Sequence, residues 1–414
     1  MSEQRKAPDF LFENVGSHGD VMPLLSIAEE LVHRGYRCQL LANEHFRAEA
    51  SARGVGFFAN AHERTHGEIQ GKGIVSYFYL KADRIREYFQ QPGAFDERTV
   101  MVHSNAFGGS EPLAEAHRLR TVELVLFPVR IRSSIAPAWP IGARACGPDR
   151  EQFLKVTLPA MYRAADRHPT LLAKINSVRV PLGLAPVSCA QYERPHVVAR
   201  AAMFPEWFGM PAADWPQLEC LGFPLPSSDQ PLPAPVQEFL ARCPRPVVFT
   251  TGTGCGSTDA FFSAAAACCA ELGMPGIFLS PFLAAGNRQL GDRIAHFAHV
   301  ELEQLLPHVA AIVHHGGMGT TARGLQAGVP QVVSPIGFDQ PDNGHRLEVL
   351  GVGRVVPRDR MSGATFATAV RELLAGSAVA SQLSHYRAAL QGVRAVERVA
   401  DLLENVARSS ARAA

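Results

Sequence analysis

The chain has 414 residues, more than the roughly 250–300 at which single hydrophobic cores stop growing, so we expect two domains. Its 40 Lys and Arg residues balance 39 Asp and Glu residues, and a net charge of +1 with no basic run argues against a nucleic-acid partner. The sequence has no signal-like start and no apolar run of the roughly 18 residues that a membrane span needs. These features predict a soluble, cytoplasmic protein and leave peripheral membrane contact and the oligomeric state open.

The front part of the chain alternates short apolar runs with a periodic helix. Residues 10–16 (FLFENVG) predict a strand, residues 23–35 predict a helix that starts at a proline and ends at a glycine, and residues 36–42 predict a second strand. Further strands are expected at 55–58, 99–104 and 122–129. This alternation predicts a parallel sheet with helices on both faces.

Residues 60–98 fit this alternation poorly. Within them, the segment SYFYLKADRIREYF (76–89) carries five aromatic residues among charged ones. Such an insertion either packs on the core or lines a pocket for an apolar substrate, and the sequence leaves both open.

A proline-dense stretch then divides the chain. We predict a first domain at 1–221, a linker at 222–237 and a second domain at 238–380, followed by a helical segment at 381–414 that packs back towards the first domain. The second domain again alternates: strands are expected at 246–252, 276–280, 310–315 and 330–335, and helices at 259–272 and from 317. The predicted fold class is α/β, with two similar halves.

The stretch IVHHGGMGTTARGLQAGVP (312–330) places glycines, histidines and threonines where a strand meets a helix. A helix start leaves backbone N–H groups unpaired and carries a partial positive charge, so glycines there let a phosphate approach closely. Thr320, Thr321 and His315 can add donors, which makes a diphosphate the simplest ligand. A tight turn without a ligand, and a metal site at the adjacent histidines, are the alternatives.

A second cluster follows the next predicted strand. Asp339 and Gln340 stand at its carboxyl end, where ligands bind in open α/β sheets. Their side chains offer acceptors and donors suited to neighbouring sugar hydroxyls. A sugar joined to a diphosphate is a nucleotide sugar.

The segment HHGGMGTTARGLQAGVPQVVSPIGFDQPDNGHRLEVLGVG closely resembles the donor-binding signature of family 1 glycosyltransferases, which have the GT-B fold of two Rossmann-like domains. The resemblance extends to GSHGDVMPLLSIAEELVHRGYRCQLLA and FPEWFGMPAADWPQLECLGFPL, and so covers most of the chain. It is closest to bacterial members acting on lipids, sterols and polyketides or macrolides, including the rhamnosyltransferase of rhamnolipid synthesis. It implies an acceptor-binding first domain and a donor-binding second domain.

The resemblance also implies roles for residues of the second domain. The diphosphate would be held by His315, Gly317, Met318, Gly319 and Thr320, and the sugar hydroxyls by Asp339 and Gln340. The loop TTGTGCGS would bring Thr251, Gly252 and Thr253 to a donor phosphate, or is an ordinary Gly-rich turn. His299 stands where the family places a tryptophan that stacks on the nucleotide base, and Arg323 replaces the family's glutamate or glutamine for the ribose.

For the catalytic base, the loop at residues 15–23 holds two titratable groups, His18 and Asp20. The family's Gly-Asp pair, followed by a proline, matches Gly19, Asp20 and Pro23, which implies that Asp20 is the base. His18 is the alternative, or assists. Asp20 could also only cap the helix that starts near Met22.

The expected activity is inverting, metal-independent hexosyl transfer with no cofactor. A UDP- or dTDP-sugar would be the donor, and the acceptor a hydroxyl of a hydrophobic small molecule, in natural product or glycolipid biosynthesis. The alternatives are a nucleotide-sugar epimerase or hydrolase on the same fold, a non-catalytic sugar-nucleotide binding protein, and an NAD-dependent oxidoreductase. GTGCGS argues weakly for the last, since its third glycine is misplaced for a dinucleotide fingerprint.

Overall fold

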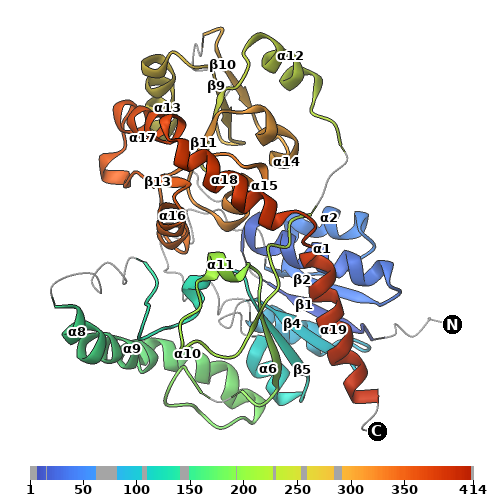
Figure 1. Cartoon of the computed structure of the whole chain (residues 1–414). Coiled ribbons are helices and arrows are strands. Elements are labelled where there is room, and N and C mark those ends of the chain that lie inside the picture. The colour runs from blue at the N-terminus through green and yellow to red at the C-terminus, as the bar shows by residue number, and fades with distance from the viewer. Residues whose placement is uncertain are drawn as a thin grey trace. The chain divides into compact units, whose positions relative to one another are not determined.

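The computed structural model describes residues 7–14, 16–61, 82–104, 110–139, 149–192, 194–226, 230–252, 259–283 and 291–411. The chain forms two compact units. Unit 1 contains residues Met1–Pro224 and Arg394–Ala414, and unit 2 contains Leu225–Val393 (Figure 1). Each unit is built on its own parallel sheet, as the sequence predicts.

The sheet of unit 1 has seven strands in the order β3-β2-β1-β4-β5-β6-β7, all parallel. The strands are β1 (Phe10–Glu13), β2 (Cys38–Asn43), β3 (Gly56–Ala61), β4 (Val100–His103), β5 (Arg120–Val125), β6 (Val197–Ala202) and β7 (Glu219–Cys220). The fully buried central strands β1 and β4 form because they read as short apolar runs, which suit a sheet covered on both faces.

Helices cover both faces of this sheet. The helices of unit 1 are α1 (His18–His33), α2 (Arg47–Ala52), α5 (Ala82–Phe89), α6 (Ser110–Ala116), α8 (Arg150–Gln152), α9 (Leu158–Asp166), α10 (Pro169–Arg179), α11 (Glu206–Gly209) and α19 (Ala395–Ala411), of which α8 and α9 lie away from the sheet (Figure 1). One core joins α1 and α19 to one face, and a second core joins α5 and α6 to the other. Ile85, Tyr88 and Phe89 of α5 are buried in the second core. For the described part of residues 76–89, packing on the core is therefore the correct alternative.

Helix α1 starts at His18, five positions before the proline at which the sequence predicts its start. Ser17 and Asp20 form a reciprocal capping box, in which the Asp20 Oδ2 atom accepts from the backbone N–H of Ser17 at 2.9 Å. Pro23 lies inside the helix. The expected loop at 15–23 is therefore wrong for most of its length, because the capping box outweighs the proline.

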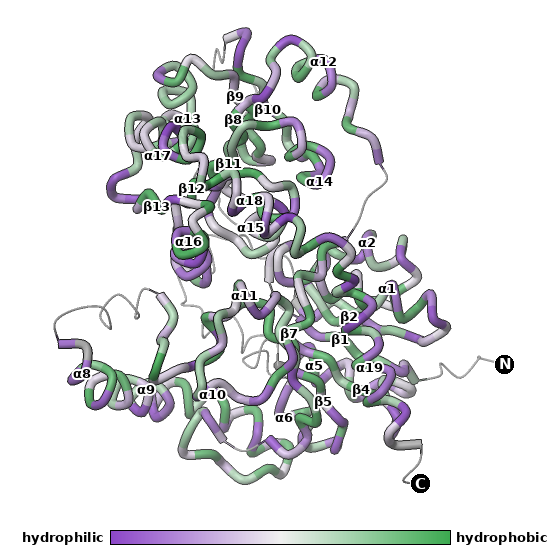
Figure 2. The backbone as a smooth tube through the Cα atoms, viewed as in Figure 1, coloured by the Kyte–Doolittle hydropathy of each residue, from purple (hydrophilic) through white to green (hydrophobic). Residues whose placement is uncertain are grey.

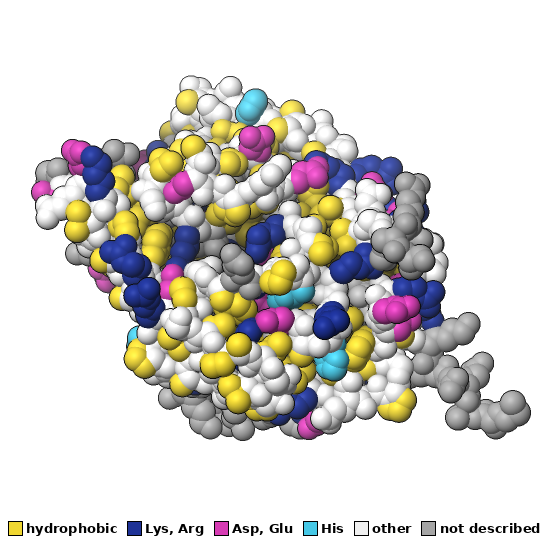
Figure 3. All heavy atoms as spheres, turned by 90° about the horizontal axis from the view of Figure 1, so that it is seen from below, with side chains coloured by type: hydrophobic (Ala, Val, Ile, Leu, Met, Phe, Trp, Pro, Cys, Tyr) yellow, Lys and Arg dark blue, Asp and Glu magenta, His cyan; other side chains and the backbone are white. Residues whose placement is uncertain are grey.

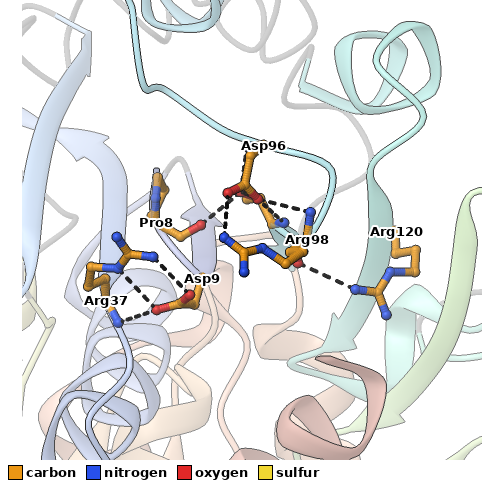
Figure 4. Close-up of polar contacts among 7 residues, drawn as sticks. Pro8, Asp9, Arg37, Asp96, Arg98 and Arg120 are labelled. Atoms are coloured by element: carbon orange, nitrogen blue, oxygen red, sulfur yellow. Dashed lines mark hydrogen bonds and ion pairs between the residues drawn. The ribbon is translucent and has the colours of Figure 1, made fainter. Parts of the chain in front are cut away.

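Ion pairs and hydrogen bonds connect the segments at the amino ends of the strands of this sheet (Figure 4). Asp9, just before β1, accepts from the backbone N–H of Arg37 at 2.8 Å and pairs with its guanidinium at 3.2 Å. Arg98 pairs with Asp96 at 3.3 Å, and its carbonyl accepts from Arg120 at 3.3 Å. The candidate residues all lie at the other end of the strands, after their carboxyl ends.

Unit 2 has a six-stranded parallel sheet in the order β10-β9-β8-β11-β12-β13. Its strands are β8 (Val247–Thr250), β9 (Gly276–Leu279), β10 (Ile294–Phe297), β11 (Ala311–His314), β12 (Gln331–Val333) and β13 (Gly353–Val355). Its helices are α12 (Ala234–Arg242), α13 (Asp259–Leu272), α14 (Leu302–Leu305), α15 (Met318–Ala327), α16 (Gln340–Val349), α17 (Gly363–Ala375) and α18 (Ser377–Leu390). The central strands β8 and β11 are strongly hydrophobic (Figure 2).

Both sheets therefore share one topology, in which the strand order reverses beside the first strand of the unit. In unit 1 the reversal lies between β1 and β4, and in unit 2 it lies between β8 and β11. Ligands of open α/β sheets bind at the carboxyl ends of the strands at such a switch point. The loops that follow β1, β4, β8 and β11 are thus where candidate residues are sought.

The predicted helical segment at 381–414 is two helices in different units. Helix α18 packs on α15 in unit 2, whereas α19 packs on α1 in unit 1. Arg34, the C-cap residue of α1, donates to Asp401 of α19 at 2.6 Å, and Leu403 of α19 is fully buried. The break at residues 391–394 therefore carries the chain from one unit to the other.

Basic side chains on the surface shown in Figure 3 lie in several separate groups among hydrophobic and acidic ones. This mixture agrees with the balanced composition of the chain. Among the residues that the structure describes, no helix combines the length and the apolar character that crossing a bilayer requires.

Candidate functional site

In unit 2, the ring of His315 lies between two glycines at the switch point. A Cβ atom at Gly252, just after β8, would lie 2.5 Å from His315 Cε1, and one at Gly317 would lie 2.4 Å from His315 Nε2. Gly252 also has φ +71°, which favours glycine. The two glycines therefore leave the space that the imidazole occupies. Sequence reasoning assigned both glycines to phosphate binding and did not foresee this packing.

Helix α15 begins directly beside that ring. Gly317 is its N-cap with extended backbone, and the N–H of Thr321 bonds the Gly317 carbonyl at 3.0 Å. The backbone N–H groups of Met318, Gly319 and Thr320 belong to the first turn, where no intrahelical acceptor exists. A Cβ at Gly319 would meet nothing within 4 Å, so open space borders this turn. Thr320 is partly exposed, whereas Thr321 is fully buried and cannot offer its hydroxyl to a ligand.

His314, the other histidine of the pair, has a structural role. Its Nδ1 atom accepts from the Gly316 N–H at 3.1 Å, and its Nε2 atom contacts Gln331 Oε1 at 3.0 Å. Burial lowers the pKa of His314 to about 3, so the ring is neutral and donates from Nε2. Both nitrogens are occupied, and the two histidine rings are 6.3 Å apart at 87°. Together these facts argue against the metal alternative for the pair.

His315 is partly exposed, and its Nδ1 atom has no hydrogen-bond partner among the described residues. Burial lowers the pKa of His315 to about 4. Near pH 7 the free protein therefore presents a neutral imidazole, which donates a hydrogen bond and adds no charge. The positive potential at this point comes from the helix start.

Asp339 and Gln340 lie where α16 begins, after β12. Gln340 Oε1 accepts from the backbone N–H groups of Ile336 at 2.7 Å and Gly337 at 3.1 Å, which directs its amide nitrogen away from the loop. Asp339 Oδ2 accepts from Asn343 Nδ2 at 2.6 Å, and the same nitrogen donates to the Gly316 carbonyl at 2.9 Å. The fully buried Asn343 thus ties this pair to the His315 turn. Sequence reasoning missed Asn343, although its spacing of four from Asp339 on a helix was the available signal.

Arg323, the departure from the family pattern, is 9% exposed. Its guanidinium donates to Gln326 Oε1 at 2.7 Å and to the Pro226 carbonyl, and lies 3.6 Å from Glu303. It is therefore packed against its own unit and is not a solvated helix residue. His299 is exposed and contacts Glu301 Oε1 at 3.1 Å, and this hydrogen bond raises its pKa.

The loop after β8 is described only in part. Thr251 is 2% exposed, so its side chain lies beneath the surface beside Gly252. Thr253, the third residue predicted here, lies outside the described residues.

In unit 1, the Asp20 side chain turns back towards Ser17, the residue before the start of α1. Its Oδ2 atom accepts from the Ser17 N–H at 2.9 Å and from the Ser17 hydroxyl at 3.1 Å. A Cβ at Gly16 would lie 2.3 Å from that oxygen, so this glycine leaves room for the carboxylate. Burial raises the pKa of Asp20 despite the two hydrogen bonds. Asp20 thus caps its helix, as the alternative proposed, and burial makes its carboxylate bind a proton more tightly than an exposed one does.

The His18 ring packs on aromatic residues that follow β2. It stacks on His45 at 5.7 Å and contacts Phe46 at 5.0 Å, and its Nε2 atom lies 4.0 Å from Glu49 Oε1. These partners come from the segment after β2. His18 is well exposed.

Buried polar residues at the ends of β1 and β4 form hydrogen bonds that hold the Asp20 turn in place. Asn14 Nδ2 donates to the Asp20 carbonyl at 2.5 Å and to the Ser104 hydroxyl at 2.7 Å, which connects the ends of β1 and β4. The position before Asn14 in β1 is also polar. In the register of the sheet, Glu13 of β1 lies beside His103 of β4, which lies beside Glu123 of β5. Burial lowers the pKa of His103 to about 4. Sequence reasoning missed these residues.

Comparison with family models and curated proteins finds relatives of one kind. Residues 283–404 match the model described as erythromycin biosynthesis protein CIII-like, C-terminal domain. The chain is 26% identical over 430 aligned positions to O-mycaminosyltylonolide 6-deoxyallosyltransferase of Streptomyces fradiae, covering 95% of this chain and 96% of that protein. It is 23% identical to a sterol 3-beta-glucosyltransferase of Eremothecium gossypii, covering 87% of this chain but 31% of that longer protein.

Solved structures share the fold over almost the whole chain. The calicheamicin glycosyltransferase CalG4 matches with a TM-score of 0.69 and 20% identity, covering 97% of this chain and 98% of that chain. The spinosyn rhamnosyltransferase SpnG, complexed with thymidine diphosphate, matches with a TM-score of 0.66 and 17% identity, covering 95% and 99%. These matches confirm the predicted fold, and the curated relatives, which are glycosyltransferases, favour glycosyl transfer over the NAD-dependent alternative. The chain is a glycosyltransferase of the GT-B fold, related to macrolide, polyketide and sterol glycosyltransferases.

Proposed function

We propose that the chain transfers a hexosyl group from a UDP- or dTDP-sugar to a hydroxyl of a hydrophobic small molecule, with inversion and without an obligatory metal. The observation that carries this proposal is the His315 ring, seated between Gly252 and Gly317 beside the start of α15. A helix start with open space at Gly319 suits a diphosphate. We further propose that Gly252, beside the buried Thr251, borders the phosphates and that His299 lies beside the base.

The proposed chemistry is a single displacement. The acceptor oxygen forms a bond to the anomeric carbon while the bond from that carbon to the diphosphate oxygen breaks. Asp20 takes the proton of the attacking hydroxyl, and its raised pKa suits this role. The departing diphosphate is stabilised by the first-turn N–H groups of α15 and by the His315 hydrogen bond. Asp339 and Gln340 hold the transferred sugar.

Relatives support the choice of substrates. The spinosyn rhamnosyltransferase SpnG binds thymidine diphosphate in its solved structure, and the Streptomyces fradiae relative is an O-mycaminosyltylonolide 6-deoxyallosyltransferase. For this chain we therefore favour dTDP over UDP and a polyketide-like acceptor over a sterol. An epimerase or hydrolase on the same fold would share the donor site but need no acceptor.

Thermal-shift titration with UDP, dTDP and GDP tests the donor site. A ligand at 100 times its Kd stabilises by about 2.7 kcal/mol, which gives a measurable rise in Tm. We expect one nucleotide to stabilise wild type, His315→Ala to lose that shift, and His315→Gln to keep part of it, because glutamine also supplies a neutral donor. His385→Ala, an exposed histidine of α18, is the control. Stabilisation by no nucleotide would contradict the proposal.

A further inference from the structure

Gly316, in the turn before α15, is held by buried side chains through both of its backbone polar groups. Its carbonyl accepts from Asn343 Nδ2 at 2.9 Å, and its N–H donates to His314 Nδ1 at 3.1 Å. Asn343 and His314 are both fully buried. Gly316 has φ +92°, and a Cβ there would lie 2.7 Å from Val333 Cγ1, so the position requires glycine.

Further hydrogen bonds within unit 2 decide which way each side chain faces. Gln331 Nε2 donates to the Thr321 carbonyl at 3.1 Å, so Gln331 Oε1 faces the His314 ring and His314 Nε2 donates to it at 3.0 Å. His314 Nδ1 is therefore the acceptor that receives the Gly316 N–H. The Asn343 amide is fixed as well, because its nitrogen contacts two oxygen atoms, of which the Gly316 carbonyl is one.

The planarity of the peptide bond carries this restraint from Gly316 to Gly317. In a trans peptide the C=O group and the N–H group that follows it point in opposite directions. Because the Gly316 carbonyl points to the buried Asn343, the Gly317 N–H points away from Asn343. No hydrogen-bond acceptor for this N–H lies in the part of the chain that the structure describes.

The Gly317 N–H belongs to the group of donors at the start of α15. Gly317 is the N-cap of this helix, and the N–H groups of the first turn that follows also lack intrahelical acceptors. A Cβ at Gly317 would lie 2.4 Å from His315 Nε2, so the His315 ring is directly beside it. Donors that are fixed before the ligand arrives stabilise a developing negative charge without the cost of reorientation.

Resting on the function proposed above, we infer that Asn343 and His314 are positioning residues of the transfer reaction, which hold Gly316 so that the Gly317 N–H faces the donor diphosphate. The N–H donates to an oxygen of the diphosphate, and this hydrogen bond strengthens as the bond from the anomeric carbon to the diphosphate breaks and negative charge collects on the leaving group. Asn343 and His314 act through the backbone of the turn. Neither side chain exchanges a proton with the substrates.

Isothermal titration calorimetry in metal-free buffer tests this inference, with NMR titration for ligands that bind weakly. The probes are dTDP and UDP, each compared with its nucleoside, thymidine or uridine. For the nucleotide that wild type binds, we expect Asn343→Ala to raise Kd about 10-fold or more, since a hydrogen bond to a charged group is lost, while Kd for the nucleoside stays within about twofold. A general loosening of unit 2 would weaken both ligands alike.

Two variants of His314 give a second test that does not depend on the folding of Asn343→Ala. In His314→Asn the side-chain oxygen stands where Nδ1 stands in histidine, so it can still accept from the Gly316 N–H. His314→Leu has no acceptor. We expect His314→Asn to bind the nucleotide about 5-fold more tightly than His314→Leu, with no such difference for the nucleoside.

Glu348→Ala is the matched control in α16. It removes a side chain that accepts from the Val355 N–H at 2.9 Å, away from the Gly316 turn, and it should keep the nucleotide affinity of wild type. Unchanged nucleotide affinity in Asn343→Ala, equal losses for nucleotide and nucleoside, or equal affinities of the two His314 variants would overturn the inference and leave the proposed function intact. Binding of neither nucleotide by wild type would overturn both.

Discussion

At the scale of single residues, three glycines leave room for the side chains of the two main candidate residues, Asp20 and His315. Gly16 lies under Asp20, and Gly252 and Gly317 flank His315. The sequence shows these glycines but not which side chain fills the space, because that depends on contacts between β8 and the turn after β11. The structural role of His314 could not be predicted from the sequence either, since its hydrogen-bond partner Gln331 lies on the neighbouring strand.

Asp20→Asn tests the proposed base. The amide oxygen of asparagine can still accept from the Ser17 N–H, so the helix cap is retained, but the proton acceptor is lost. We expect donor binding to stay nearly unchanged and kcat to fall by roughly 10²–10⁴. His18→Ala is the comparison and should change kcat little, since its ring packs on His45 and Phe46. Unchanged turnover in the asparagine variant would assign the base elsewhere.

The same residue predicts the pH dependence of the rate. Burial raises the pKa of Asp20 above its ordinary value of 3.8, and a base acts only when it is deprotonated. We therefore expect kcat/KM to fall as pH falls through this raised pKa, with an acid limb that lies above pH 3.8. A pH–rate profile of wild type at fixed ionic strength measures this limb. It should be absent from the residual activity of Asp20→Asn.

At the scale of elements, the sequence predicts helices well where their ends are marked by glycine. Helix α15 runs from its N-cap Gly317 to Gly328 at φ +70°, as expected from residues 317–328. Helix α1 was placed too late because Pro23 looked like its start, whereas Ser17 and Asp20 begin it. The short strands β10 and β13 were missed, since three or four residues carry too little periodicity to predict a strand.

Gly319 separates helix stability from ligand binding in α15. A Cβ at this position meets nothing within 4 Å, and alanine is favoured over glycine inside a helix by about 0.5–1 kcal/mol. Gly319→Ala should therefore raise the Tm of the free protein slightly and weaken nucleotide binding, because the methyl group fills the space beside the first-turn N–H groups. Thermal melts with and without dTDP measure both effects. A tighter dTDP complex in this variant would contradict a diphosphate at the helix start.

At the scale of the whole chain, unit 1 depends on residues that follow unit 2. Val399 and Leu403 of α19 are fully buried against the core of unit 1. Burying two such side chains contributes on the order of 3–6 kcal/mol. Removal of residues 394–414 should therefore destabilise unit 1 strongly while unit 2 keeps its nucleotide-dependent stabilisation.

Tryptophan fluorescence measures this prediction directly. All three tryptophans, Trp139, Trp207 and Trp215, belong to unit 1. Urea unfolding followed at these residues should show an early transition in the truncated chain. Arg408→Ala, a change at an exposed side chain of α19, is the control and should leave the transition unchanged. A truncated chain with the fluorescence transition of wild type would show that α19 is dispensable for unit 1.

The passage of the chain through unit 2 before it returns to unit 1 also sets an order of events during synthesis. Every residue of unit 2 is synthesised before residues 394–414, so the α1 surface of unit 1 lacks its cover until the chain beyond unit 2 has been made. The Asp20 turn at the start of α1 therefore reaches its final stability only when α19 docks on α1.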